Sequence, residues 1–269
     1  MPLTNTSISD FEALANARGE GWHITNMAAV ATNQMLQIVE YGMMNSQTAL
    51  EAGIVHNPNG SSTCYFITGS TSDLGNATGH ATSTQVSINN TISTQTDEGY
   101  RAISYRGMEN PWGNVWQLIG GLNVNGTNEV GGGTPYICTD FNYTPGVISE
   151  NYESVGFALP AAYKWINAMG YGDEKYDWVF LPIECSNNAN SLLPVGDAIW
   201  STNGLRNVNI LAVGGSYGFG DESGLFYYAA DRAVNESARN NYGAKLMYIP
   251  TKNSIYNANI NKWKAKIGG

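Results

Sequence analysis

One stretch near the end of the chain, residues 213–249, constrains the fold more than any other. It places two apolar segments around an interior punctuated by glycine and crowded with Tyr, Phe, Asp, Glu, Arg and Asn. Glycine permits tight turns in such an interior, and the apolar segments are typical of core elements. We predict that Leu225, Phe226, Leu246 and Ile249 point inward. A rigid scaffold that holds a polar and aromatic segment is how binding surfaces are commonly built.

The charge of the chain indicates which partners it avoids. Only 13% of the residues are charged, about half of the usual ~25%. Asn, Ser, Thr and Gly take the place of charged residues, and a polar but uncharged surface of this kind is common in secreted and virion proteins. The formal net charge is −9, and the one basic run consists of Lys262, Lys264 and Lys266. Because such a chain repels phosphate backbones, we expect no nucleic-acid partner.

Length and hydropathy predict one domain without a membrane span. The 269 residues, 42% of them hydrophobic, suffice for one large domain, and no clean linker divides them. We predict a single domain over 1–269 with insertions at roughly 55–100 and 125–175 and a C-terminal tail at 251–269. No run of ~20 apolar residues occurs, so we expect no membrane partner. Residues 1–7 lack the basic and apolar regions of a secretory signal.

Hydrophobic periodicity predicts two helices near the N-terminus. The first covers residues 9–18, where Ser9 and Glu12 have the spacing of a capping box. The second covers 27–44, because apolar residues recur there three and four positions apart. Asn26 precedes it and is a suitable N-cap.

The rest of the chain favours strands, which together with the helices predicts an α+β protein. We expect a hairpin region within 54–100, a strand at 115–119, and buried strands at 177–182 and 199–200. Residues 160–169 begin with proline, which suits the first position of a helix, and we predict a short helix there.

Five segments, forming three blocks, together resemble a known family. They read ARGEGWHI (17–24), NPWGNVWQL (110–118), VGGSY (213–217), GLFYY (224–228) and GAKL (243–246). Their order and spacing are similar to those of C-type-lectin-fold proteins of the formylglycine-generating-enzyme-like branch. Within that branch they are nearest to bacteriophage tail and receptor-binding proteins, including variable proteins diversified by retroelements. The resemblance covers most of 8–249 and implies a C-type-lectin-like fold, in which two helices flank a twisted antiparallel sheet with long loop insertions.

The resemblance assigns structural roles to Trp112, Asn114 and Trp116. In the family, the tryptophans of this block fill the core, and the asparagine side chain bonds to the backbone of a tight turn. A buried indole needs an acceptor for its N–H, which nearby loops would supply. Two positions depart from the family pattern, since Tyr217 stands where Trp is commoner and Lys245 stands where Arg is usual.

The resemblance also implies an exposed ligand-contacting face over residues 213–242. Aromatic side chains there supply contact area at low entropic cost, while Asp, Asn and Arg supply hydrogen bonds. The predicted ligand-binding residues are Tyr217, Phe219, Asp221, Glu222, Tyr228, Asp231, Arg232, Asn235, Arg239, Asn240 and Tyr242.

These features predict a phage receptor-binding or tail-fibre tip adhesin located in the virion or outside the cell. Its ligand would be a bacterial cell-surface glycan or protein, bound without covalent chemistry. Other virion tail subunits would be partners, and we expect a homo-oligomer such as a trimer, because multivalency strengthens weak single-site binding. A structural baseplate or decoration protein that uses the same fold for assembly is the alternative.

An enzyme of the formylglycine-generating type is a weaker alternative. Catalytic members of that branch use paired cysteines after the Gly-Gly-Ser segment, whereas no cysteine follows Cys185 here. The histidines His23, His56 and His80 lack zinc-site spacing, and we predict no metal site. The calcium-binding triplets Glu-Pro-Asn and Gln-Pro-Asp of calcium-dependent lectins do not occur. We predict no cofactor, although calcium is left open without support.

Overall fold

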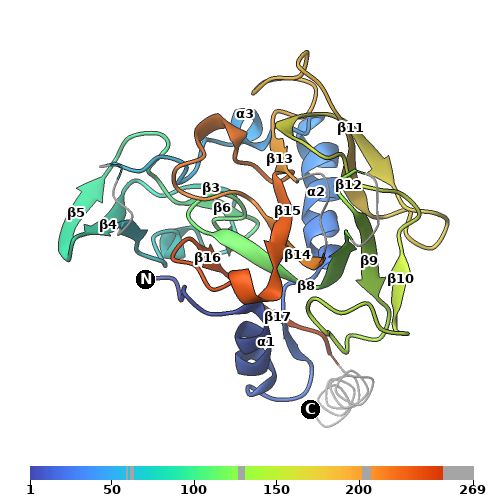
Figure 1. Cartoon of the computed structure of the whole chain (residues 1–269). Coiled ribbons are helices and arrows are strands. Elements are labelled where there is room, and N and C mark those ends of the chain that lie inside the picture. Colours follow the sequence, from blue (N-terminus) through green and yellow to red (C-terminus); the bar gives the residue numbers. More distant parts are fainter. Residues whose placement is uncertain (59, 61–63, 127–130, 202–206, 251–269) are drawn as a thin grey trace, which may run out of the picture.

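The chain is predominantly β-structure with few helices (Figure 1). This computed structural model describes residues 1–58, 60, 64–126, 131–201 and 207–250. The predicted α+β class is confirmed. Within these ranges no helix is long and apolar enough to cross a membrane. The predicted tail at 251–269, with its three lysines, lies outside the described residues.

The first helix, α1 (Ile8–Asn16), begins before the predicted capping box. Ser7 is the N-cap, and its hydroxyl accepts a hydrogen bond from the backbone N–H of Asp10 at 3.1 Å. The predicted box of Ser9 and Glu12 is wrong because the Glu12 side chain turns inward. One of its carboxylate oxygens accepts from the backbone N–H of Ile24 at 3.0 Å instead.

The second helix, α2 (Met27–Tyr41), begins where the sequence predicts. The amide oxygen of Asn26 accepts from the backbone N–H of Ala29 at 3.0 Å, which satisfies one of the free donors of the first turn. Gly42 ends the helix in the left-handed conformation at φ 68°, slightly before the predicted end. A short helix, α3 (Ser46–Ala49), follows it.

The main sheet has nine strands in the order β10-β9-β8-β14-β15-β13-β11-β12, with β16 paired to β8. It curls into a half-barrel (Figure 1). The bounds are β8 (Trp116–Asn125), β9 (Thr134–Cys138), β10 (Tyr152–Ser154), β11 (Tyr163–Tyr171), β12 (Phe180–Cys185), β13 (Ala198–Trp200), β14 (Val208–Val213), β15 (Tyr228–Ala233) and β16 (Tyr242–Gly243). The β13–β15 and β16–β8 pairs are parallel, so the sheet is mixed and the predicted all-antiparallel arrangement is wrong.

The predicted helix at 160–169 is also wrong, because most of that segment belongs to β11. This strand lies between β12 and β13 and pairs antiparallel with both. Tyr163 and Trp165 are aromatic residues that suit a pleated surface, and the neighbouring strands supply the pairing. Pro160 precedes the strand, where its missing N–H costs no ladder hydrogen bond.

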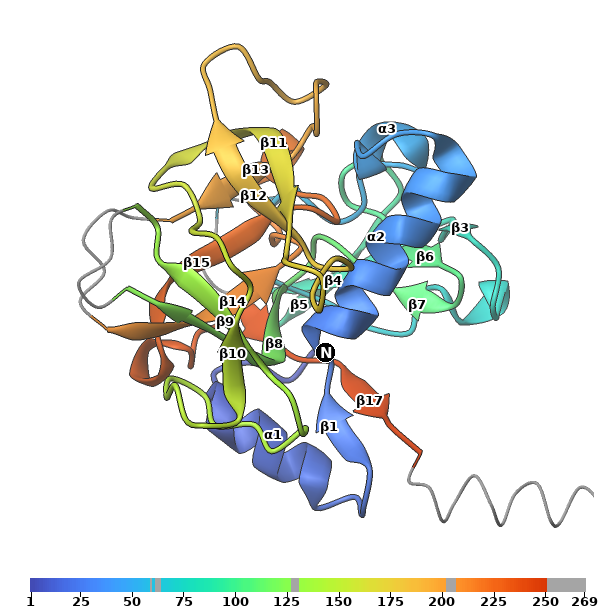
Figure 2. The ribbon, with the colours of Figure 1, turned by 90° about the vertical axis from the view of Figure 1, so that its right-hand side faces the viewer.

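The sheet separates two hydrophobic clusters. Along β14, Leu211 and Val213 belong to the cluster that includes the buried face of α2, whereas Ile210 and Ala212 belong to the cluster that includes α1. Side chains of a strand alternate between the two faces of a sheet, so both faces of this central strand are covered. The helices α1 and α2 therefore pack against different sides of the main sheet (Figure 2).

Three smaller sheets complete the fold. They comprise β1 (Trp22–Ile24) with β17 (Leu246–Tyr248), β2 (Cys64–Phe66) with β4 (Thr84–Ile88) and β5 (Thr91–Gln95), and β3 (Gly79–His80) with β6 (Ile103–Tyr105) and β7 (Met108–Glu109). The predicted hairpin region is confirmed by β4 and β5, which are joined by Asn89 and Asn90 at φ 48° and 64°, as a two-residue type I′ turn requires. Three 3-10 turns are η1 (Ser72–Leu74), η2 (Gly220–Glu222) and η3 (Val234–Glu236).

The two tryptophans of the NPWGNVWQL block are fully buried. The indole N–H of Trp112 donates to the carbonyl of Ala52 at 3.0 Å, which supplies the acceptor that burial demands. Asn114 has a left-handed φ of 60°, and its backbone carbonyl accepts from the N–H of Tyr217. Its side-chain oxygen is buried and has no hydrogen-bond partner among the described residues, unlike the expected side-chain bond.

Candidate binding surface

Part of the predicted ligand-binding face lies in the core. Tyr217, Tyr228 and Tyr242 are at most 7% exposed, and the prediction that they lie on an exposed face is wrong. The hydroxyl of Tyr228 donates to the carbonyl of Phe180 at 2.7 Å. Both faces of the first half of β15, from Tyr228 to Ala230, pack against hydrophobic clusters, so alternation along this part of the strand leaves no solvent-exposed side.

Two of the four inward predictions for the same stretch are right. Leu225 and Phe226 are buried in the cluster that includes α2. Leu246 is 49% exposed, and its predicted burial is wrong. It lies on β17, which forms a two-stranded sheet with β1 among the described residues. Ile249 is partly buried.

Two predicted residues, Phe219 and Glu222, belong to a cluster at the surface. The hydroxyl of Tyr163 donates to the Glu222 carboxylate at 2.7 Å, and that of Tyr227 donates to it at 3.0 Å. The ring of Trp200 lies 4.7 Å from that of Tyr163 and 5.9 Å from that of Phe219, measured between centroids. Tyr163 is 52% exposed. We call Tyr163, Trp200, Phe219 and Glu222 the aromatic–acidic patch.

The chemistry of the patch is that of a hydrogen-bond acceptor with aromatic edges. Burial, and then the hydrogen bond to Glu222, raises the pKa of Tyr163 to about 12, so its hydroxyl stays protonated at neutral pH and donates. Each carboxylate oxygen has two lone pairs, and the Glu222 carboxylate can therefore accept further donors from a ligand. Phe219 lies edge-on to Trp116 and Tyr227, which fixes its orientation.

Most of the remaining predicted residues are accessible. Asp231 and Arg232, on β15, form an ion pair at 3.1 Å, in which the Arg232 side chain is 25% exposed but the Asp231 side chain is only 7% exposed and therefore buried. Burial raises the pKa of Asp231, and the charge of Arg232 opposes that rise. A strand rises ~3.3 Å per residue, so this pair lies about 13 Å along the chain from Tyr227. The other accessible residues are Asp221, Asn235, Arg239 and Asn240, of which the first two are exposed and the last two partly buried.

Tyr163 and Trp200 are site residues that the sequence analysis missed. They are Cα partners in the antiparallel β11–β13 pair, which brings residues 37 positions apart in the sequence side by side. Each is an aromatic residue in a strand, and the sequence around it carries no further local signal. Their meeting with Phe219 depends on sheet order, and sheet order cannot be read from single segments.

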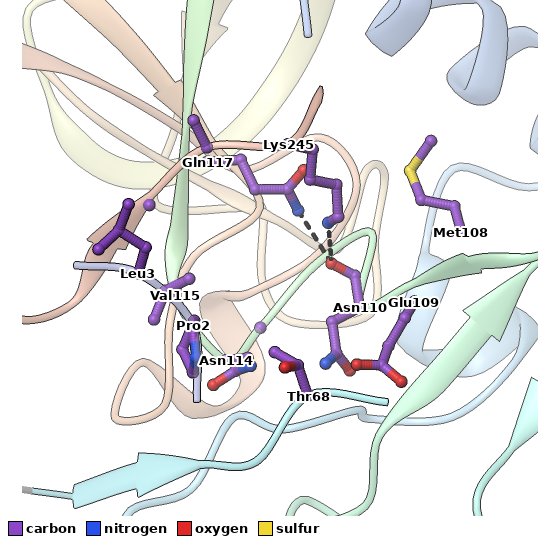
Figure 3. A pocket seen from close by; sticks show the side chains of 13 residues that line it. Pro2, Leu3, Thr68, Met108, Glu109, Asn110, Asn114, Val115, Gln117 and Lys245 are labelled. Atoms are coloured by element: carbon purple, nitrogen blue, oxygen red, sulfur yellow. Dashed lines mark hydrogen bonds between the residues drawn. The ribbon is translucent and has the colours of Figure 1, made fainter. Parts of the chain in front are cut away.

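A pocket of about 340 Å³ lies beside the NPWGNVWQL block (Figure 3). The ammonium group of Lys245 enters it and donates to the carbonyl of Asn110 at 2.6 Å, and the amide of Gln117 donates to the same oxygen at 2.9 Å. Burial lowers the pKa of Lys245 to about 7, against the opposing charge of Glu109. In the sequence, this lysine stands out only as a departure from the family pattern.

The pocket does not hold a free acid–base pair. Both carboxylate oxygens of Glu109 accept backbone N–H groups, from Gly69 at 2.7 Å and Thr71 at 2.9 Å. The Thr71 hydroxyl donates to the same carboxylate. The apolar part of the lining comes from Pro2, Leu3, Met108 and Val115. The pocket thus offers one amine in a largely structural setting, which is a poor arrangement for acid–base chemistry.

The histidines and cysteines are engaged elsewhere. In the described ranges, no group of three His, Cys, Asp or Glu residues is placed to hold a metal ion. The ring nitrogen of His23 lies 2.8 Å from the Glu12 carboxylate. Cys64, Cys138 and Cys185 are not disulfide-bonded, and burial raises the pKa of each thiol. Reactive thiolates are therefore disfavoured at neutral pH.

Comparison with known proteins identifies no family for this chain, so the candidate site is chosen from the geometry. The sequence matches neither the models of known protein families nor any curated protein. Among the places described above, the aromatic–acidic patch joins the exposed ring of Tyr163 to an accepting carboxylate, while the Lys245 pocket offers an ammonium already bonded to Asn110 and the buried, unpartnered side-chain oxygen of Asn114. The patch is therefore the stronger candidate for recognition.

Proposed function

We propose that the protein is a phage receptor-binding or tail-fibre tip adhesin with a C-type-lectin-like fold. It binds a bacterial surface ligand through the aromatic–acidic patch and the accessible residues of 213–242. The carrying observation is the Glu222 carboxylate, which two phenol hydroxyls orient beside the exposed ring of Tyr163. Clustered surface aromatics next to directed polar groups are typical of binding surfaces, because they give contact area and direction together.

The fold supports this proposal because it places the aromatic–acidic patch on a rigid base. Trp116 contacts the rings of Phe219, Tyr227 and Tyr242, so the patch rests on a packed aromatic core. Two helices flanking a curled sheet and the two buried tryptophans agree with the lectin-like architecture. A rigid base lowers the entropy lost when a ligand binds.

A bacterial surface glycan suits the patch well. The C–H faces of a sugar ring pack against aromatic faces, which carry partial negative charge. Sugar hydroxyls would donate to Glu222, and the partly exposed guanidinium of Arg232 on β15 would contact a further sugar unit. A protein ligand would use the same groups. The adhesin acts without covalent chemistry, beside other tail subunits, and as an oligomer whose several sites add avidity.

The test compares a double variant of the patch with a matched tyrosine control. Tyr163→Ala combined with Glu222→Gln removes the exposed ring and the charge, and we expect at least a tenfold loss in binding to envelopes from a panel of bacteria and to a glycan array. Tyr171→Ala is the control, because Tyr171 lies on the same strand, is 60% exposed and is not part of the patch. Its binding should equal that of the wild type.

The thermal midpoint of the double variant should stay close to the wild-type value, since Tyr163 is half in solvent. Undiminished binding by a folded double variant would refute the patch as the ligand site. The structural-protein alternative makes a different prediction, namely that the patch is buried against another subunit in assembled particles. Protection of Tyr163 from footprinting reagents in the virion would favour that alternative.

A further inference from the structure

A second cavity, of about 260 Å³, lies where the β9–β10 connection meets the β11–β12 connection and the start of α2. Four aromatic side chains line it. Phe141 and Tyr143 come from the first connection, and Tyr176 and Trp178 come from the second. Ring contacts join the members of each pair, at 6.4 Å and 6.3 Å between centroids. We call this cavity the aromatic cleft.

The ring of Tyr143 packs closely against β8 at a point where the strand has glycines and no side chain blocks the ring. A Cβ atom on Gly121 would lie 2.5 Å from the Tyr143 ring, and one on Gly120 would lie 2.9 Å from it. The side-chain amide of Asn26 donates to the Tyr143 hydroxyl at 3.0 Å. The strand thus has two glycines at the position where this ring lies, which fixes one wall of the cleft.

Phe141 is both exposed and conformationally strained. Its ring is 44% exposed, and its φ of 63° lies in the left-handed region that large residues avoid. The Asp140 carboxylate holds this turn by accepting from the backbone N–H of Asn142 at 2.9 Å and from the side chain of Asn151 at 2.8 Å. Such strain persists only where the surroundings enforce it, and it gathers at ligand-binding positions.

The opposite wall combines apolar area with a polar rim. Trp178 packs partly against the core cluster that includes α2, and Tyr176 is buried. The Tyr176 hydroxyl donates to the Glu153 carboxylate at 2.9 Å, and the ammonium of Lys175 pairs with the same carboxylate at 2.5 Å. The exposed residue Thr139 is also part of the lining, and its hydroxyl donates to the carbonyl of Asn151 at 3.1 Å, which leaves the hydroxyl oxygen to accept from a ligand. Donors and acceptors therefore border an aromatic interior.

We propose that the aromatic cleft binds one pyranose ring of a glycan. A pyranose has apolar C–H faces, which would pack on Phe141 and Trp178, and a hydroxyl edge, which would reach Lys175 and Thr139. The cavity is smaller than the roughly 300–1,000 Å³ of sites for drug-sized ligands, which suits a single ring. A phosphate-bearing ligand is disfavoured because the net charge is −9 and Lys175 is already paired.

This site shares no residue with the aromatic–acidic patch, and the inference does not rest on the proposed function. The test uses saturation-transfer NMR with the methyl pyranosides of glucose, galactose, mannose and N-acetylglucosamine as separate probes. We expect transfer to the C–H protons of at least one of them. Titration of that glycoside should show at least a tenfold weaker affinity for Phe141→Gly, and an unchanged affinity for Tyr163→Ala.

Phe141→Gly also separates a binding role from a structural one. Glycine adopts a left-handed φ without strain, so the variant should melt at the wild-type temperature or above it while losing the sugar. A lower melting temperature would mark Phe141 as a structural residue and overturn the inference. The inference would also be overturned if none of the four glycosides received transfer, or if Phe141→Gly left the transfer unchanged. Indole and phenol serve as additional probes. Transfer to these two alone would overturn the inference as well, because it would indicate a site for aromatic side chains.

Discussion

At the scale of single residues, Lys245 ties stability to pH. Its pKa of about 7 in the folded chain lies below the ~10.4 of a lysine in an unfolded chain. Between these values the unfolded chain holds a proton that the folded chain has released, so the free energy of unfolding rises with pH across this window. Lys245→Met should therefore stabilise the protein on the order of 2–4 kcal/mol near pH 6 and almost not at all near pH 11.

Urea unfolding at several pH values measures this effect. The carbonyl of Asn110 keeps a donor in the variant, because Gln117 also bonds to it. Lys164→Met, at an exposed lysine of β11, is the control and should shift stability little at any pH. A gain for Lys245→Met that does not change with pH would show that its ammonium is well solvated in the folded state.

The residues that sequence reasoning placed correctly are those whose role is set by close neighbours. Asn26 caps α2 through a residue three positions away, and Trp112 is large and apolar enough to be core in most settings. Tyr217 and Tyr228 are buried, whereas Tyr163 is half-exposed, although all three have the same side chain. What separates them is which face of the sheet is covered, and that depends on distant elements.

At the scale of elements, β8 accommodates the β9–β10 connection through its glycines. Gly121 has φ 69°, and a Cβ there would lie 2.5 Å from the Tyr143 ring. Gly42, at the end of α2, has nearly the same φ of 68° but nothing within 4 Å of the added Cβ. Gly42→Ala should cost only the left-handed backbone term of roughly 1–2 kcal/mol, whereas Gly121→Ala should cost roughly 1–3 kcal/mol more through overpacking.

Comparison of the two variants separates the cost of backbone strain from the cost of steric conflict. Urea unfolding measures the loss in free energy of unfolding for each variant. Equal losses for the two would mean that the Tyr143 ring moves aside freely. The aromatic cleft would then lack a fixed wall, because Tyr143 forms one side of it.

The type of an element could be predicted where it follows from a local sequence pattern. Local patterns were misleading where pairing with distant strands determines the element. The heptad-like apolar spacing predicted α2, and the two asparagines between short polar strands make the β4–β5 turn. Proline at 160 was a local helix signal, yet the segment after it became β11 because β12 and β13 pair with it on both sides. Long-range hydrogen bonding outweighs a propensity difference of ~1 kcal/mol or less per residue.

At the scale of the whole molecule, the β2-β4-β5 sheet is a separate sheet that contacts the rest of the fold through its own hydrophobic cluster. Its own hydrophobic cluster includes Cys64 and Phe66, and Tyr217 belongs to that cluster. The backbone N–H of Tyr217 bonds to the carbonyl of Asn114, which leads into β8. This link passes through the core and joins the two sheets, so we expect them to unfold together, as a single domain over 1–269 would.

The three cysteines report on this directly, because they lie in different parts of the fold. Cys64 is in β2, Cys138 is in β9, and Cys185 is in β12. Burial raises the pKa of Cys64 and Cys185 to about 11, so both thiols stay protonated near pH 8 and react slowly with alkylating reagents while folded. Pulse alkylation across a urea gradient, with each cysteine resolved by mass spectrometry, should give three coincident labelling curves.

Labelling of Cys64 at lower urea than Cys138 would mean that the insertion opens by itself. The Tyr217–Asn114 link would then be too weak to couple it to the sheet that carries the aromatic–acidic patch.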